Sequence, residues 1–199
     1  MPQTPGQGDW LTGRRILVAV AGGIAAYKTC TLVSRLVQRG AEVTVCMTDA
    51  ATHFVGPLTF QSLSGRTVFT SLWQVDQRPD AQHIDLAQSA DLMIIAPATA
   101  DIIAKLAHGI ADDLVSTVAC ALPRRTAMLL APAMNAEMWT NPITQENLAK
   151  LKDVLGWRTI GPETGWQACR TAGVGRMSEP QQILQAAIDL IGRPDEPPA

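Results

Sequence analysis

The chain has 199 residues, enough for one compact domain with a substantial core but too few for two domains of ordinary size. Hydrophobic residues make up 47% and charged residues 17% of the sequence, which is typical of a globular protein and excludes a disordered chain. The formal net charge of −2 argues against nucleic acid or an anionic membrane as main partner, and no apolar run reaches the roughly 18 residues of a membrane span.

Both ends of the chain differ in composition from its middle. Residues 1–13 are rich in Pro, Gly and Gln and lack the basic and apolar regions of a signal peptide, and residues 193–199 read RPDEPPA. We expect both ends to be disordered, and residues 14–192 to form a single domain in the cytoplasm.

The four cysteines, Cys30, Cys46, Cys120 and Cys169, lie far apart and form none of the close pairs of zinc or redox dithiol sites. Free thiols are therefore the default, and we expect no metal site. The first three fall in predicted helices or strands, where we expect them to be buried as small hydrophobic residues.

Strands and helices alternate along the chain. Continuous apolar runs predict buried strands, and apolar residues at helical spacing predict helices. The predicted order is strand 15–21, helix 24–38, strand 42–47, strand 91–96, helices 99–107 and 114–122, strand 127–131, helix 142–155 and strand 157–160. A last helix, with Ser178 as N-cap and Gln181 three residues on, would end near Ile191. This alternation predicts a single-domain α/β fold with a doubly wound parallel sheet, flavodoxin-like or Rossmann-like.

Ligands of such sheets bind beyond the carboxyl ends of the strands, so the residues that follow each strand are candidates for a site. Gly22, Gly23 and Ile24 join the first strand to the first helix, where glycines and free N–H groups suit a phosphate. A tight turn without a ligand is the alternative. The segment matches neither GxGxxG nor GxxxxGK[ST], which favours a mononucleotide over a dinucleotide or ATP. Thr48, after the second strand, would either add a hydroxyl to the same site or cap a helix.

Three further residues have side chains suited to catalysis or substrate binding. Asn135 follows the strand 127–131, where its amide could orient a carboxylate or thiolate, or cap a turn. His83 lies in a polar segment and is either a base or an ordinary surface histidine. Cys169 lies in the sequence GWQACRTAGVGRM, whose glycines predict a mobile lid over a site. Its thiol, beside Arg170, is either reactive or simply exposed on a flexible turn.

Taken together, these segments resemble the flavin-containing cysteine decarboxylases, and among them the phosphopantothenoylcysteine decarboxylases. The resemblance extends from Arg14 to about Ile191. The motifs that carry it are GGIAAYK (22–28), HID (83–85), APATADIIAKLAHGIADDL (96–114), APAMN (131–135) and ACRTAGVGRM (168–177). It implies a flavodoxin-like fold, non-covalently bound FMN, and homotrimers or dodecamers with the active site at the subunit contact. It also implies a synthetase partner, fused or separate.

The resemblance assigns a role to individual residues. For the flavin it implies two binding segments and one residue beside the ring: Gly22, Gly23, Ile24 and Thr48; Thr99, Ala100, Asp101 and Ile102; and Ala133. For catalysis it implies His83 as the active-site histidine and Cys169 as proton donor. For the substrate it implies Asn135 at the carboxylate, with Ala168, Arg176 and Met177 on a flap that closes over it.

The reaction that the resemblance implies is decarboxylation of 4′-phospho-N-pantothenoylcysteine to 4′-phosphopantetheine in coenzyme A biosynthesis, through thioaldehyde and enethiolate intermediates. The alternatives are a peptidyl-cysteine decarboxylase, a flavin prenyltransferase, and a regulatory subunit that binds FMN without catalysis. Two residues depart from the family pattern. Arg170 stands where Gly is usual, and Gln88 where a basic residue is common, so that Arg170 or Arg78 would have to supply the missing cation.

Overall fold

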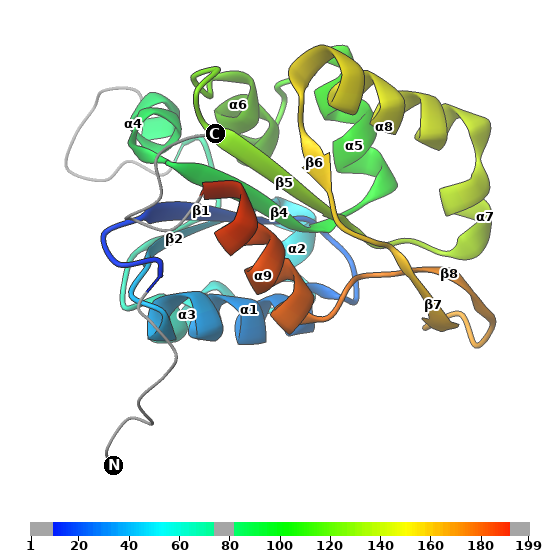
Figure 1. Cartoon of the computed structure of the whole chain (residues 1–199), viewed down its shortest axis with the longest axis horizontal. Helices are drawn as coiled ribbons and strands as arrows, with labels where there is room; N and C mark the ends of the chain where they lie inside the picture. The colour runs from blue at the N-terminus through cyan, green and yellow to red at the C-terminus, as the bar shows by residue number, and fades with distance from the viewer. Residues whose placement is uncertain (1–9, 74–81, 192–199) are drawn as a thin grey trace.

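A computed structural model describes residues 10–73 and 82–191 of the protein (Figure 1). Its centre is a sheet of six parallel strands in the order β3-β2-β1-β4-β5-β6. The strands are β1 (Arg15–Val20), β2 (Glu42–Met47), β3 (Val68–Phe69), β4 (Leu92–Ala98), β5 (Ala127–Pro132) and β6 (Arg158–Thr159). This order, in which the direction of winding reverses between β1 and β4, is that of Rossmann-like sheets. The predicted doubly wound α/β fold is therefore confirmed.

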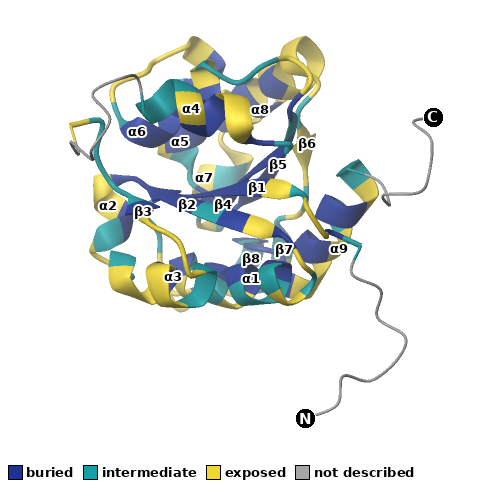
Figure 2. Cartoon of the chain, turned by 90° about the vertical axis from the view of Figure 1, so that its left-hand side faces the viewer, coloured by how far each residue is buried: buried dark blue, intermediate teal, exposed yellow. Residues whose placement is uncertain are grey.

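Helices cover both faces of the sheet, and Figure 2 shows the three layers edge-on. One face carries α1 (Ala26–Gln38), α3 (Pro57–Ser64) and α9 (Pro180–Ile191), and the other carries α4 (Gln82–Ser89), α5 (Ala100–His108), α6 (Leu114–Cys120) and α8 (Pro142–Leu155). Strand β1 shows why both faces are needed. Ile16 and Val18 pack under α1 and α9, whereas Leu17 and Ala19 pack under the helices of the other face. A run without polar residues is stable only when both of its faces are covered.

The remaining elements lie beyond the carboxyl ends of the strands. Two short helices, α2 (Asp49–Thr52) and α7 (Ala136–Thr140), follow β2 and β5. Strands β7 (Glu163–Trp166) and β8 (Ala172–Arg176) pair with each other as an antiparallel hairpin, which we call the flap. The mobile lid expected from the glycines of this segment is thus a paired hairpin in the structure.

The long elements confirm the predicted ones. Most short elements were not predicted, although β6 lies within the predicted strand 157–160. Helix α8 has the predicted bounds, and β1, β4 and β5 lie within two residues of theirs. Strand β3 has only two residues, and α4 buries only Leu86 and Ala87, so neither produces a clear periodicity. The cap of α9 was wrong. Pro180 begins this helix, so Glu179 rather than Ser178 directly precedes it, and the backbone N–H of Glu179 donates to Gln182 Oε1 at 2.8 Å.

Two further expectations need correction. Residues 10–13 are ordered, because Leu11 is fully buried and its N–H donates to the carbonyl of Arg39 at 3.2 Å. Residues 1–9, 192–199 and 74–81, with Arg78 in the last of these ranges, lie outside the described residues.

The prediction that three cysteines are buried holds for Cys46, and burial raises the pKa of its thiol to about 12. It is wrong for Cys120, which is exposed at the end of α6. Among the described residues, no helix combines the length and apolarity needed to cross a membrane.

Candidate active site

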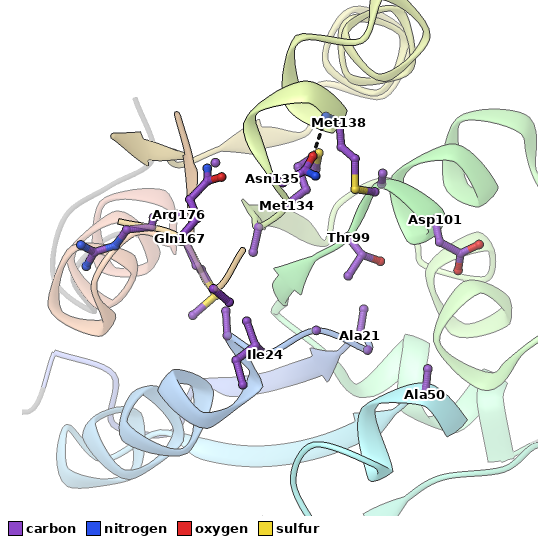
Figure 3. Close-up of a pocket in the computed structure, with 18 of the residues that line it drawn as sticks. Ala21, Ile24, Ala50, Thr99, Asp101, Met134, Asn135, Met138, Gln167 and Arg176 are labelled. Atoms are coloured by element: carbon purple, nitrogen blue, oxygen red, sulfur yellow. Dashed lines mark hydrogen bonds between the residues drawn. The ribbon is translucent and has the colours of Figure 1, made fainter. Parts of the chain in front are cut away.

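A cavity of about 1170 Å³ opens at the carboxyl ends of β1, β2, β4 and β5 (Figure 3). It lies at the point where the winding of the sheet reverses, which is the usual ligand position in such folds. Its walls come from the turns that follow these four strands and from the flap. Of the predicted site residues, the following line it: Gly22, Gly23, Ile24, Thr48, Thr99, Ala100, Asp101, Ala133, Asn135, Ala168, Cys169, Arg176 and Met177.

Two of the predicted residues do not line the cavity. Ile102 is fully buried behind it and contributes its backbone N–H, which donates to Thr99 Oγ1 at 3.3 Å. This places Ile102 in the core beneath the cavity rather than at its surface. His83 lies half-buried in the first turn of α4, on the face of the sheet that α5 and α6 also cover. His83 could therefore act in this cavity only if it came from another copy of the chain.

The glycine turn brings two loops into direct contact. A Cβ atom on Gly22 would lie 2.4 Å from the Cβ of Ala50, so a side chain at this position has no space. A Cβ on Gly23 would lie 3.5 Å from Thr99 Cγ2, which is ordinary contact. Gly22 is thus required by packing of the protein itself, whereas Gly23 leaves its backbone open to the cavity.

The helices that begin at the cavity differ in how they are capped. Helix α1 has no side-chain cap, so its first-turn N–H groups have positive character that suits an anion. Thr48 and Thr99 cap α2 and α5, because their Oγ1 atoms accept from the backbone N–H of Ala51 at 3.2 Å and of Ile102 at 3.3 Å. A hydroxyl that accepts in this way still has its own hydrogen to donate to a ligand. Capping and ligand binding are therefore compatible roles for both threonines.

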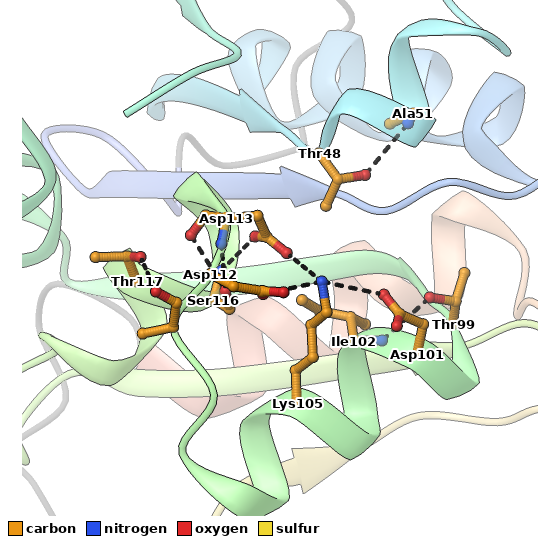
Figure 4. Close-up of polar contacts among 11 residues, drawn as sticks. Thr48, Ala51, Thr99, Asp101, Ile102, Lys105, Asp112, Asp113, Ser116 and Thr117 are labelled. Atoms are coloured by element: carbon orange, nitrogen blue, oxygen red, sulfur yellow. Dashed lines mark hydrogen bonds and ion pairs between the residues drawn. The ribbon is translucent and has the colours of Figure 1, made fainter. Parts of the chain in front are cut away.

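An ion-pair network borders the cavity beside Thr99 (Figure 4). The Nζ atom of Lys105 lies 2.9 Å from Asp113 Oδ2, 3.0 Å from Asp112 Oδ1 and 3.6 Å from Asp101 Oδ2. Burial by itself would lower the pKa of Lys105, but hydrogen bonds to Asp113 and Asp112 raise it overall. Asp113 also caps α6 by accepting from the N–H of Ser116 at 2.8 Å. The network fixes the start of α5 relative to α6, and sequence analysis missed it although Asp101 and Lys105 have helical i,i+4 spacing.

Asn135 is the N-cap of α7, and its Oδ1 accepts from the backbone N–H of Met138 at 2.8 Å. No described residue accepts a hydrogen bond from its Nδ2 group. The amide therefore combines the two interpretations left open by the sequence, since its oxygen caps the helix and its NH₂ group is available to a ligand.

The flap places Cys169 in the turn between β7 and β8. Its Sγ atom lies 3.0 Å from Thr171 Oγ1 and 3.5 Å from Gln167 Oε1, and the residue is exposed at the cavity. Arg170 has a φ of 63°, the only left-handed conformation of a non-glycine residue in the described part of the chain. Glycine adopts this conformation without steric cost, which explains in physical terms why Arg170 is an unusual residue here.

The base of the flap is attached to both sides of the cavity. The backbone N–H of Met134 donates to the carbonyl of Gly175 at 3.0 Å, and a Cβ on Gly175 would lie only 2.1 Å from Met134 O. Lys28 Nζ donates to Glu179 Oε1 at 2.7 Å, and Arg176 donates to the same oxygen at 2.8 Å. The hydrogen bond from Lys28, together with Arg176, holds the pKa of Glu179 below its usual range. Sequence analysis missed Lys28 and Glu179 as parts of the site.

Within residues 10–73 and 82–191, no three His, Cys, Asp or Glu side chains cluster in a way that could hold a metal ion. The cavity offers hydroxyl, amide and thiol groups together with an uncapped helix N-terminus, and its cations Lys28, Lys105 and Arg176 are each paired with a carboxylate. This set can bind an anion at one end and donate a hydrogen bond and a proton at the other.

Comparisons with known proteins place this cavity in context. Residues 7–192 match the family described as Flavoprotein. The coenzyme A biosynthesis bifunctional protein CoaBC of Haemophilus influenzae is 47% identical over 183 residues, which cover 92% of this chain and 45% of the relative. The chain thus spans less than half the length of this curated relative.

Two solved structures are similar over nearly their whole length. One is a PPC decarboxylase, a cysteine-to-serine variant complexed with pantothenoylaminoethenethiol, with a TM-score of 0.79 and 31% identity over 87% of this chain and 96% of that one. The other is the FMN binding protein AtHal3, with a TM-score of 0.77 and 32% identity over 87% of this chain and 94% of that one.

Proposed function

The chain belongs to the Flavoprotein family, and on this premise we propose that it is an FMN-dependent decarboxylase that converts 4′-phospho-N-pantothenoylcysteine to 4′-phosphopantetheine. The observation that carries the proposal is one cavity that joins the uncapped N-terminus of α1 to Asn135 and Cys169. A flavin phosphate suits the first of these groups, and a substrate with a carboxylate and a thiol suits the other two. The bifunctional relatives support a place in coenzyme A biosynthesis, and the proposal includes a cytoplasmic location and a synthetase partner.

The described residues fit FMN. The first turn of α1 and the backbone of Gly23 would hold the phosphate, with a hydroxyl from Thr48. Thr99 and Ala133 border the middle of the cavity, where the ring would lie. When bound, FMN supplies reversible hydride transfer, so that the substrate passes through a thioaldehyde and a decarboxylated enethiolate without net oxidation.

The protein groups bind the substrate and move its protons. The NH₂ group of Asn135 donates to the substrate carboxylate. This hydrogen bond orients, within the cavity, the carbon–carbon bond that breaks when CO₂ leaves. After CO₂ has left, Cys169 donates a proton to the carbon that carried it, and the thiol becomes a thiolate. The enethiol ligand of the similar PPC decarboxylase, seen in a cysteine-to-serine variant, supports this order of steps.

His83 would assist removal of the proton from the substrate thiol, and because it lies outside its own chain's cavity, it would act on the cavity of a neighbouring copy. Large apolar side chains at the cavity mouth support a subunit contact there. Ile24, Tyr27 and Trp166 are 59%, 60% and 66% exposed. A homotrimer, or a dodecamer of trimers, with the active site at the contact is therefore part of the proposal.

The proposal is tested with purified protein, first by its visible spectrum and then by CO₂ release. We expect a bound flavin band, CO₂ release from 4′-phospho-N-pantothenoylcysteine, and a much slower reaction with a peptide that ends in cysteine. A protein without flavin contradicts the proposal entirely. Faster reaction with the peptide would make it a peptidyl-cysteine decarboxylase, and flavin without CO₂ release from either substrate would indicate a regulatory subunit.

A further inference from the structure

We propose that Gln167 is a positioning residue, whose side-chain amide holds the turn that carries Cys169 against the N-terminus of α7. This inference rests on the proposed function and adds to it the group that places the proton donor. The main observation in its support is that a buried amide lies in an otherwise exposed turn. Gln167 is 7% exposed, whereas Ala168 and Cys169, the next two residues, are exposed.

The amide of Gln167 joins three segments. Its Oε1 accepts from the backbone N–H of Ala136 at 3.2 Å, and its Nε2 donates to the carbonyl of Val174 at 3.0 Å. The first bond reaches α7 and the second reaches β8, on the opposite strand of the flap. The Oε1 atom therefore attaches the flap to the cavity wall, and the Nε2 atom joins the two sides of the flap. Figure 3 shows Gln167 among the residues that line the cavity.

The flap has space for this amide because of its glycines. A Cβ on Gly175 would lie 2.8 Å from Gln167 Nε2, and one on Gly173 would lie 3.8 Å from it. A side chain at Gly175 would thus displace the amide as well as the adjacent carbonyl of Met134. The glycines that predict a mobile lid in the sequence also leave space for this buried side chain.

Two side-chain amides, of Asn135 and Gln167, bind the start of α7 and so link the carboxylate-binding residue to the turn that carries Cys169. The first N–H groups of a helix have no partner within the helix. Asn135 takes one of them, the N–H of Met138, and Gln167 takes another, the N–H of Ala136. Helix α7 therefore fixes the carboxylate-binding amide and the flap relative to each other.

The same oxygen of Gln167 faces the thiol. Cys169 Sγ lies 3.5 Å from Gln167 Oε1 and 3.0 Å from Thr171 Oγ1, so the thiol hydrogen has two acceptors in the turn. Loss of the amide removes one acceptor and the anchor of the turn together. We expect the proton donor to move away from the substrate while the binding of flavin and carboxylate remains.

The test measures CO₂ and thiol product separately in the flavin-loaded full chain, for Gln167→Ala, Gln167→Asn and the control Gln185→Ala. Asparagine is one methylene too short to reach both Ala136 and Val174. Gln185 is an exposed residue of α9, and its side-chain amide donates to Asp189 within the same helix rather than to the flap. In a single turnover without oxygen, both Gln167 variants should release CO₂ within about threefold of the natural protein but form thiol about tenfold more slowly, because a misplaced acid loses part of its contribution. The missing product should appear as enethiol, with an equal amount of flavin left reduced.

A second readout does not depend on turnover. In a Cys120→Ser background, we expect iodoacetamide to alkylate Cys169 faster in the Gln167 variants than in the control, as measured by peptide mass spectrometry. An unchanged ratio of thiol to CO₂ in both variants would overturn the positioning role. So would loss of flavin from both, since the amide would then support the cofactor site. If the natural protein releases no CO₂, the proposed function fails instead, and faster alkylation would still show that Gln167 holds the turn.

Discussion

The two walls of the cavity are built in different ways. The sheet-side wall consists of turns that follow fully buried strands, and its shape is set by backbone packing, as at Gly22 against Ala50. The flap-side wall is a two-stranded hairpin held by polar side chains, chiefly Gln167 and Glu179. Backbone packing suits a site that holds one cofactor permanently, whereas a few polar contacts suit a segment that opens for substrate and product.

The largest effect on CO₂ release should come from Asn135→Asp, which separates the two roles of this residue. Aspartate still caps α7, because its oxygen accepts from the N–H of Met138, but it has no NH₂ group and adds a negative charge beside the substrate carboxylate. We expect kcat/KM for CO₂ release to fall by about 100-fold or more, with little change in stability. Asn141→Asp, at the N-cap of α8, is the matched control and should leave kcat/KM unchanged. A comparable loss of kcat/KM in both variants would mean that the added charge acts from either helix start, and it would contradict the role of the Asn135 NH₂ group.

The sheet-side wall is tested by a pair of alanine substitutions. Gly22→Ala should destabilise the protein by about 1–3 kcal/mol, because the added methyl group overlaps Ala50. Gly23→Ala meets only ordinary contacts and should change stability by less than about 0.5 kcal/mol, while it weakens FMN binding. Urea unfolding of the flavin-free protein and flavin fluorescence titration separate the two effects. Equal stability of the two variants would contradict the packing described for Gly22.

These contrasts also show what could be predicted from the sequence. Strands β1, β4 and β5 are continuous apolar runs, and the site residues that follow strands, Gly22 and Asn135, could be identified because parallel strands end at one edge. Gln167 could not, because its role depends on hydrogen bonds that exist only after the hairpin has closed. Ile102 was misplaced because a motif identifies a segment, while helix periodicity decides which side chain faces the core.

The flap-side wall contains one strained residue that can be relieved. Arg170→Gly should stabilise the turn by about 1 kcal/mol, since glycine adopts the left-handed conformation without steric cost. Arg170→Ala keeps the Cβ atom and should give no gain. Hydrogen exchange of the N–H groups of Gln167 and Arg170, which bond across the turn, reports this directly. Slower exchange in both variants would assign the effect to loss of the arginine charge.

The smallest effect concerns pH. Because Lys28 lowers the pKa of Glu179, their interaction contributes stability above the ordinary glutamate pKa of about 4.3, and this is lost as pH falls through the lower pKa of the folded state. Since the Glu179 side chain is 45% exposed, we expect less than about 1 kcal/mol. Urea unfolding between neutral pH and pH 3 should show a flatter profile for Glu179→Gln than for the natural protein. Identical profiles would remove this contact from the account.

The central claim, that Cys169 is the proton donor of a flavin-dependent decarboxylation, is tested most directly by the products of Cys169→Ser. The account predicts that in a single turnover the flavin-loaded variant, given 4′-phospho-N-pantothenoylcysteine, releases CO₂ and accumulates the enethiol with its flavin left reduced, while thiol formation falls by about 10²–10⁴-fold. Formation of 4′-phosphopantetheine at the rate of the natural protein would contradict it.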